Sequence, residues 1–300
     1  MARPEDPGDM TDMTTTTAMA PAGSRALRLF LRNPNAVAGM LILATVLFAA
    51  IFADLLAPGD PLTMVAQPFL WPGQNPAYPL GTDMMGRDVL AGIIHGSRVS
   101  LAVGLAATAT SLLIGTLVGA ITGYYGGWID RVGMNLVEIV QTPPNFLLLV
   151  VIVAIWQPNL PTVAIGIGAV SWPTLARLVR GEFRAIRGKE FVTAAHSLGF
   201  SDARIIFREV LPNALPPVVV TSSVLVATAI LMESALSFLG LSDPNRVSWG
   251  SMIGEGREML RTAWYLAAVP GLCIFSTVLA FNLIGDGLND AMNPRLAGRE

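Results

Sequence analysis

The chain has few of the side chains on which enzyme active sites and metal sites depend. Its 300 residues include one cysteine and two histidines, and Lys189 is the only lysine. Because Lys189 lies in Gly-Lys-Glu, the Gly-Lys-Ser/Thr of a phosphate-binding loop is absent. Cys273 has no partner for an intrachain disulfide, and the spans described below place His95 and His196 on opposite sides of a membrane. The sequence therefore predicts no catalytic residue, no metal site and no bound cofactor, so that another chain must supply the energy for any ATP-driven work.

Charged residues are scarce as well. They make up 13% of the chain, against roughly 25% in a typical soluble domain, and the net charge is −2. Nucleic-acid-binding proteins carry a basic surface, so this near-neutral chain is not expected to bind DNA or RNA. Hydrophobic residues, in contrast, account for 53% of the chain, and the mean hydropathy is +0.58. This composition predicts a membrane protein.

Six apolar runs approach the length of about 20 residues with which a helix crosses a bilayer. Pro143 and Pro144 interrupt the third run, which we expect to kink or unwind there. Gly115, Gly119 and Gly123 recur at four-residue spacing in the second run, and such a stripe lets two helix backbones approach closely in lipid. The predicted fold class is an all-α membrane protein with six transmembrane helices, at residues 36–57, 99–122, 132–156, 161–178, 215–236 and 263–283.

A few polar residues lie within these runs. Glu138 and Gln141 come just before the two prolines, and Glu233 lies near the far end of the fifth run. A polar group buried in a membrane is costly, so such residues usually face a partner helix or a water-filled path. For Glu138 an equally good alternative is a hydrated position near the membrane interface. The candidates for a translocation path are Glu138, Gln141, Pro143 and Glu233.

Six spans place both termini on one side of the membrane, and the distribution of arginine indicates which side. If the N-terminus is cytoplasmic, the inner segments hold most of the arginines and Lys189. The outer segments then hold only Arg87, Arg98, Arg246, Arg257 and Arg261. The positive-inside rule favours this orientation. Residues 1–24 are expected to be a disordered cytoplasmic tail and residues 291–300 a second cytoplasmic tail. A signal peptide is disfavoured, because the first apolar run lies far from the N-terminus and is long enough to span a bilayer.

A short polar interruption at residues 190–212 separates two of the long apolar runs. Phe191, Ala194, Ala195 and Leu198 have the spacing of one helix face, and Gly199 suits the left-handed turn that ends such a helix. These features predict a first short helix with an apolar face.

A second helix is predicted directly after this turn. Ser201 is a good N-cap, Arg204 and Arg208 lie one turn apart, and Pro212 is expected to end the helix. The face predicted to be apolar consists of Ala203, Ile206, Phe207 and Val210. Three interpretations fit this helix-turn-helix pattern: a DNA-binding unit, a packed hairpin without a partner, and a loop that contacts an ATPase.

Other stretches have distinctive sequences, notably residues 28–43, PLGTDMMGRDVLAGIIHGSRVSLAVG at 79–104, GYYGGWID at 123–130 and the run at 237–253. Together with residues 190–212 they resemble permease subunits of ABC importers, and more narrowly the dipeptide/oligopeptide/nickel family of the DppC/OppC type. Ala194, Ala195 and Gly199 are in register with the EAA loop of these permeases, as are Leu211 and Pro212. Two positions depart from that pattern, since Thr193 stands in place of its Glu and Glu209 in place of its Ile.

The resemblance implies a type I ABC importer permease fold with cytoplasmic EAA coupling helices, in the bacterial inner membrane. It implies a segment at 25–98 with the first span and a periplasmic loop, followed by a permease domain at 99–290. The implied partners are a homologous second permease, two ATPases that bind ATP and Mg²⁺, and a periplasmic or lipid-anchored solute-binding protein. Di- or oligopeptides are the expected cargo; the alternatives are a nickel chelate, glutathione or another small solute, or a stand-alone secondary transporter. The implied ATPase-coupling residues are Glu190, Phe191, Thr193, Ala194, Ala195, Leu198, Gly199, Ser201, Arg204, Arg208 and Pro212.

Overall fold

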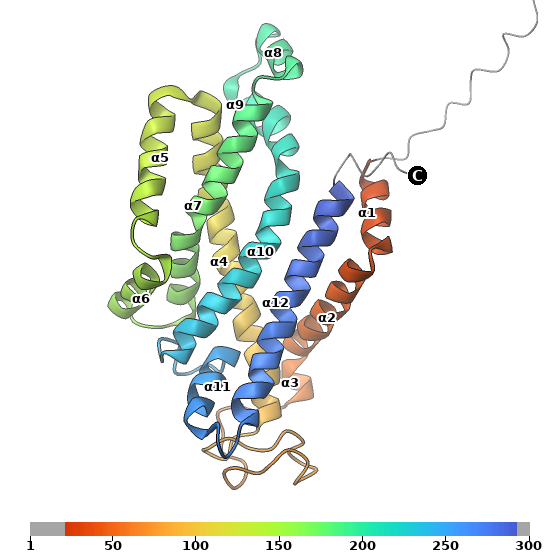
Figure 1. The fold of residues 1–300 in the computed structure, drawn as a ribbon, viewed down its shortest axis with the longest axis vertical. Coiled ribbons are helices and arrows are strands. Elements are labelled where there is room, and N and C mark those ends of the chain that lie inside the picture. Colours follow the sequence, from red (N-terminus) through yellow and green to blue (C-terminus); the bar gives the residue numbers. More distant parts are fainter. Residues whose placement is uncertain (1–21, 293–300) are drawn as a thin grey trace, which may run out of the picture.

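The computed structural model describes residues 22–292, and these are almost entirely helical (Figure 1). The predicted tail residues 1–21 and 293–300 lie outside the described part of the chain. The elements in chain order are α1 (Ala22–Arg32), α2 (Pro34–Ile51), α3 (Ala53–Leu56), α4 (Val89–Tyr125), α5 (Gly127–Gln141), α6 (Asn145–Trp156), α7 (Leu160–Ile186), α8 (Glu190–Ser197), α9 (Asp202–Arg204), a π-helix (Ile205–Val210), α10 (Leu211–Phe238), α11 (Trp249–Gly256), a 3-10 helix (Arg257–Met259) and α12 (Tyr265–Met292).

Within the described residues, five helical segments are long and apolar enough to cross a membrane. They are α2, α4, α7, the continuous segment Asp202–Phe238 that contains α10, and α12. Helices α5 and α6 meet the same criterion together, with a bend of 79° between them. The break contains Pro143 and Pro144, which cannot donate a backbone hydrogen bond, so the predicted interruption is confirmed. With this pair counted as one broken span, the described residues contain six candidate spans, the number predicted.

The two ends of the bundle differ in what they carry (Figure 1). One end, called here the hairpin end, carries α8 and α9, and the end of α12 and the start of α1 lie toward it. The opposite end, called here the loop end, carries α3, α11 and the long segment that joins α3 to α4. His196 in α8 and His95 in the first turns of α4 therefore lie at opposite ends, as predicted.

Helices α4 and α7 pack with almost no space between their backbones. A Cβ added to Gly115, Gly119 or Gly123 would lie within 2.8 Å of atoms in α7. At Gly119 the obstructing atoms are the carbonyl oxygen of Ala176, at 2.5 Å, and Cβ of Val179, at 2.7 Å. The predicted glycine stripe is therefore a helix contact, and it makes α4 and α7 one closely packed pair.

The segment between α3 and α4 is held against the loop end by hydrogen bonds. Thr82 is buried; its hydroxyl donates to the carbonyl oxygen of Gln67 and accepts from the backbone N–H of Leu70. The Tyr265 hydroxyl at the start of α12 lies 2.9 Å from the carbonyl oxygens of both Leu70 and Thr82. These contacts fix the position of the residues that lead into α4.

Candidate functional site

The hairpin at residues 190–212 has the predicted first helix and turn. Helix α8 begins at Glu190, whose carboxylate lies in the first turn, where the helix dipole favours negative charge. The helix is followed by Gly199, which has a φ of +76°, the left-handed conformation that was predicted for it. The N–H of Gly199 donates to the carbonyl of His196 at 2.9 Å, and the N–H of Phe200 to that of Ala195 at 3.2 Å. These bonds close the turn.

The exposed apolar face of α8 differs from the predicted one. Ala195 is only 5% exposed and packs inward with Val192, so the exposed face includes only part of the predicted apolar face. Phe191, Ala194 and Leu198 remain exposed, with Leu198 at 72%. Two overlapping apolar stripes run along α8, and the stripe with Val192 and Ala195 is the one that packs on the core. The exposed face of α8 therefore consists of Phe191, Ala194 and Leu198, with Thr193 beside it.

The second arm differs more from its prediction because of a π-helix. The wide turns of the π-helix bury Ile205 and Val210, five residues apart, and leave Phe207 64% exposed. Pro212 was predicted to end the helix. This prediction was wrong, because the chain continues directly into α10. Pro212 lies in the first turn of α10, just after the wide turn, where the missing N–H disturbs the helix least.

The polar residues of this second arm lie near its surface. Ser201 is at the N-cap position of α9, but its side chain accepts no capping hydrogen bond from the described residues. The guanidinium of Arg204 lies over the ring of Phe200, 3.7 Å from the ring centre, as a cation–π contact. Arg208, one turn on, is exposed. The hairpin thus presents an apolar face on one arm and two arginines on the other.

The candidate path residues do not form one cluster. Glu138 is exposed on α5, and Gln141 accepts a hydrogen bond from Arg177 of α7. Pro143 is half-buried in the break between α5 and α6. Glu233 is only 2% exposed and lies among serines near the C-terminal end of α10.

The group around Glu233 joins three elements. Its carboxylate accepts hydrogen bonds from Ser237 of α10, at 2.7 Å, and from Ser100 of α4, at 3.3 Å. The Ser100 hydroxyl in turn accepts the backbone N–H of Trp249 at the start of α11, at 3.4 Å. Ser248, the N-cap of α11, donates to the Ser237 hydroxyl at 3.3 Å. Serine hydroxyls donate hydrogen bonds to both carboxylate oxygens of Glu233. Through these serines, Glu233 links α4, α10 and α11 in this conformation.

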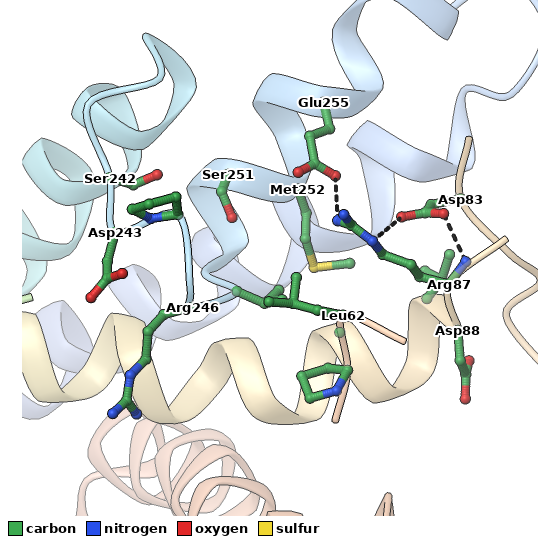
Figure 2. A pocket seen from close by; sticks show the side chains of 15 residues that line it. Leu62, Asp83, Arg87, Asp88, Ser242, Asp243, Arg246, Ser251, Met252 and Glu255 are labelled. Carbon is green, nitrogen blue, oxygen red and sulfur yellow. Dashed lines mark hydrogen bonds and ion pairs between the residues drawn. The ribbon is translucent and has the colours of Figure 1, made fainter. Parts of the chain in front are cut away.

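A hollow of about 650 Å³, open to solvent, lies at the loop end beside α11 (Figure 2). One side carries Arg87, whose guanidinium lies 3.5 Å from the Glu255 carboxylate and 3.9 Å from that of Asp83. Asp243 and Arg246 lie at the other side, with Met252 between them and Arg87 (Figure 2). Partial burial raises the pKa of Glu255, and the charge of Arg87 opposes this shift.

The sequence motifs indicate no role for the residues of this hollow. Arg87 and Glu255 are 168 positions apart, and only the packing of α11 beside α4 brings them together. Arg87 lies in one of the stretches that supported the family resemblance, and Glu255 comes two residues after another. In the described residues, no group of three or more His, Cys, Asp or Glu side chains is arranged to hold a metal ion.

The chain matches known families and proteins over most of its length. Residues 115–298 match the family described as "Binding-protein-dependent transport system inner membrane component", and residues 22–77 match the "N-terminal TM domain of oligopeptide transport permease C". The chain is 38% identical over 273 residues to the dipeptide transport system permease protein DppC of Haemophilus influenzae, covering 89% of this chain and 92% of that protein. It is also 38% identical over 270 residues to the glutathione transport system permease protein GsiD of Pectobacterium atrosepticum, covering 90% of each.

A solved structure is similar in fold. The MetNI methionine ABC transporter, in an inward-facing conformation, contains a chain that matches with a TM-score of 0.56, over 67% of this chain and 97% of that one. The sequence identity is 17%, so this likeness concerns the fold alone.

Proposed function

The chain belongs to the family of binding-protein-dependent transport system inner membrane components, as its motifs predicted, and we propose that it forms one half of the membrane pore of an ATP-driven importer of short peptides. The membership establishes a multi-pass membrane transport protein rather than an enzyme. The partner chains, the cargo and the orientation in the membrane belong to the proposal.

The observation that carries the proposal is the exposed apolar face of α8. Leu198 and Phe191 are exposed on a short helix that projects from the end of the bundle, whereas Val192 and Ala195 fix the helix to the core (Figure 1). An exposed apolar patch on a rigidly held element is typical of a contact with a partner protein. We assign this face to docking on an ATPase that supplies the energy from bound ATP and Mg²⁺. Glu190, Thr193, Arg204 and Arg208 would form the polar rim of the contact.

The proposed orientation places the hairpin end in the cytoplasm, together with both termini. Arg177, Arg180, Arg184 and Arg187 of the last turns of α7 and just beyond it lie toward this end, which suits the positive-inside rule. The loop end, with the hollow of Figure 2, then faces a periplasmic or lipid-anchored solute-binding protein. The proposed division of the chain is a segment at 25–98, a permease domain at 99–290 and cytoplasmic tails at 1–24 and 291–300.

The outer surface of the bundle supports the proposed assembly with a homologous second permease. A single chain of six spans has apolar side chains on its outer surface and leaves Glu138 exposed on a spanning helix. A partner permease would enclose a polar path between the two chains, and Glu138 is the candidate that is already accessible. Glu233, in contrast, would become accessible only if α10 and α11 moved apart.

The proposed cargo is a di- or oligopeptide, because the similar protein of Haemophilus influenzae is named for dipeptide transport. Glutathione is a second candidate, since GsiD has the same identity to this chain over a similar length. Both are flexible peptide-like zwitterions, so the pore need not differ between them. A free metal ion is disfavoured as cargo because the described residues contain no clustered metal ligands.

Uptake into proteoliposomes tests this proposal. The chain is co-expressed with a homologous permease, ABC ATPases and a solute-binding protein, and labelled dipeptide or glutathione is offered outside with ATP inside. We expect ATP-dependent dipeptide uptake that unlabelled dipeptides inhibit. Uptake of glutathione alone would replace the first candidate by the second, and uptake of neither by an ATPase-active complex would contradict both.

A further inference from the structure

We infer that Tyr124 is the positioning residue that links the hairpin to α4, so that movement imposed on the hairpin moves the α4–α7 pair. The inference rests on the proposed function, because it concerns how force from an ATPase would enter the membrane helices. Tyr124 is the last residue but one of α4 and is only 8% exposed. Nothing in the sequence motifs assigned it a role.

The Tyr124 side chain contacts both arms of the hairpin. Its hydroxyl donates a hydrogen bond to Oδ1 of Asp202, in the first turn of α9, at 2.9 Å. The Tyr124 hydroxyl oxygen also lies 3.3 Å from Nε2 of His196 in α8. When Nε2 carries the proton, it donates a hydrogen bond to this oxygen. The Tyr124 and His196 rings are also nearly parallel, with centres 6.3 Å apart. One side chain therefore fixes the two arms relative to each other and to α4.

The backbone of the same residue is bonded to the end of α7. Arg187, which follows α7, donates from its guanidinium to the carbonyl oxygen of Tyr124 at 2.7 Å and to that of Gly123 at 3.4 Å. These carbonyls belong to the last turn of α4, where no further helix turn satisfies them. Tyr124 is thus the point at which α4, α7 and both arms of the hairpin meet.

Helix α4 is suited to carry a displacement from this point to the opposite end. Its 37 residues correspond to a rod of about 55 Å. Close packing at Gly119 and Gly123 prevents it from sliding independently of α7. At the loop end, the carbonyl of Ile93 accepts the indole N–H of Trp249 at 3.0 Å, which joins α4 to α11. A movement of the hairpin would therefore reach the group around Glu233 through one continuous helix.

The alternative is that these contacts only stabilise the fold. A structural role would lower the amount of assembled complex and reduce all its activities together. If Tyr124 has a positioning role, its loss instead lowers the ratio of peptide transport to ATP hydrolysis. The ATPases still turn over, but hydrolysis no longer drives transport. The test therefore measures both rates on complexes of verified composition.

The substitution Tyr124→Phe keeps the buried ring and removes the hydroxyl that contacts Asp202 and His196. In the purified complex, with binding protein and dipeptide, we expect the peptide transported per ATP hydrolysed to fall about tenfold, because hydrogen bonds to a charged group are among the stronger ones. Basal ATPase activity should stay within about twofold of wild type. Asp202→Ala removes the same hydrogen bond from an exposed residue and should have a similar effect, whereas Asp202→Asn keeps an uncharged acceptor oxygen and should lose less coupling than Asp202→Ala.

Tyr125→Phe is the matched control, because Tyr125 is the next residue, is 48% exposed and makes no hydrogen bond through its hydroxyl within the described residues. We expect wild-type coupling from it. In the double variant Tyr124→Phe/Asp202→Ala, the second substitution should add little to the first. Wild-type coupling in Tyr124→Phe and Asp202→Ala, or a parallel loss of basal and stimulated rates, would overturn the inference. A wild-type complex that does not couple hydrolysis to uptake would instead contradict the proposed function.

Discussion

Replacement of Gly119 by alanine tests whether α4 and α7 depend on direct backbone contact. The new Cβ would lie 2.5 Å from the carbonyl oxygen of Ala176 and 2.7 Å from Cβ of Val179, closer than real Cβ contacts. The oxygen must retreat by about 0.9 Å to reach ordinary contact at 3.4 Å. Because both obstructing atoms belong to a helix and neither is the end of a flexible chain, the two helices must separate.

The cost follows from this separation. Overpacking of a close contact costs about 1–3 kcal/mol of the free energy of unfolding. Alanine also favours a helix over glycine by about 0.5–1 kcal/mol, which offsets part of the loss. Gly181→Ala on α7 is the matched control, because its Cβ would meet nothing within 4 Å and it receives only the favourable contribution. The two variants should therefore differ by about 1–3 kcal/mol, with Gly119→Ala the less stable.

Thermal unfolding of the detergent-solubilised chain, followed by circular dichroism, measures this difference. For a chain of this size we expect the midpoint of Gly119→Ala to lie roughly 2–10 °C below that of Gly181→Ala. Equal midpoints would show that the α4–α7 contact adjusts without cost, and the argument that these helices move as one pair would then be refuted.

Three further predictions concern the hairpin and the hollow. Leu198→Glu places a charge on the exposed face of α8; it should leave the thermal midpoint unchanged but weaken ATPase binding roughly tenfold or more, measured by pull-down titration with Leu198→Met as the control. Gly199→Trp forces a large side chain into a φ of +76°, at a cost of about 1–2 kcal/mol, and should abolish ATP-driven uptake while membrane insertion persists; normal uptake would exclude the coupling role. Partial burial raises the pKa of Glu255 above its ordinary value of 4.5 despite the nearby charge of Arg87, so the folded state binds the proton more tightly than the unfolded state. The free energy of unfolding therefore decreases as pH rises from about 4.5 through the higher pKa of the folded state. The thermal midpoint of wild type relative to Glu255→Gln should therefore fall as pH is raised from about 4 to 7, and a rise over that range would contradict the environment assigned to Glu255.

Much of the architecture could be predicted from local sequence. The broken third span follows from Pro143 and Pro144, and the contact between α4 and α7 from the spacing of Gly115, Gly119 and Gly123. These features depend on what a residue lacks, a backbone N–H or a Cβ, and that property does not change with tertiary context. The left-handed turn at Gly199 was predictable for the same reason.

Side-chain orientation within the hairpin was less predictable. The apolar spacing of α8 allows Ala195 to face either way, and only the position of the core decides that it turns inward. In the second arm, the π-helix changes the period of the buried positions, so Ile205 and Val210 are buried whereas Phe207 of the predicted apolar face is exposed. A regular helical period cannot anticipate a local change in the hydrogen-bond pattern.

Contacts between segments far apart in the chain could not be predicted from the sequence pattern. The approach of Arg87 to Glu255, and the hydrogen bond from Tyr124 to Asp202, each require several helices to be placed correctly. Single residues in these pairs have no distinctive local context. Glu233 was identified as unusual because of its place in an apolar run, but its surrounding serines come from three elements that are separated in the chain.

The measurement that tests the central claim most directly compares the purified chain alone with the chain in its co-expressed complex, both reconstituted in liposomes. ATP hydrolysis and dipeptide uptake are measured in each preparation, with and without loaded binding protein. We predict that the chain alone shows neither activity and that the complex shows both, with stimulation by loaded binding protein. Dipeptide uptake by the chain alone, driven by an ion gradient, would contradict the account and identify a secondary transporter.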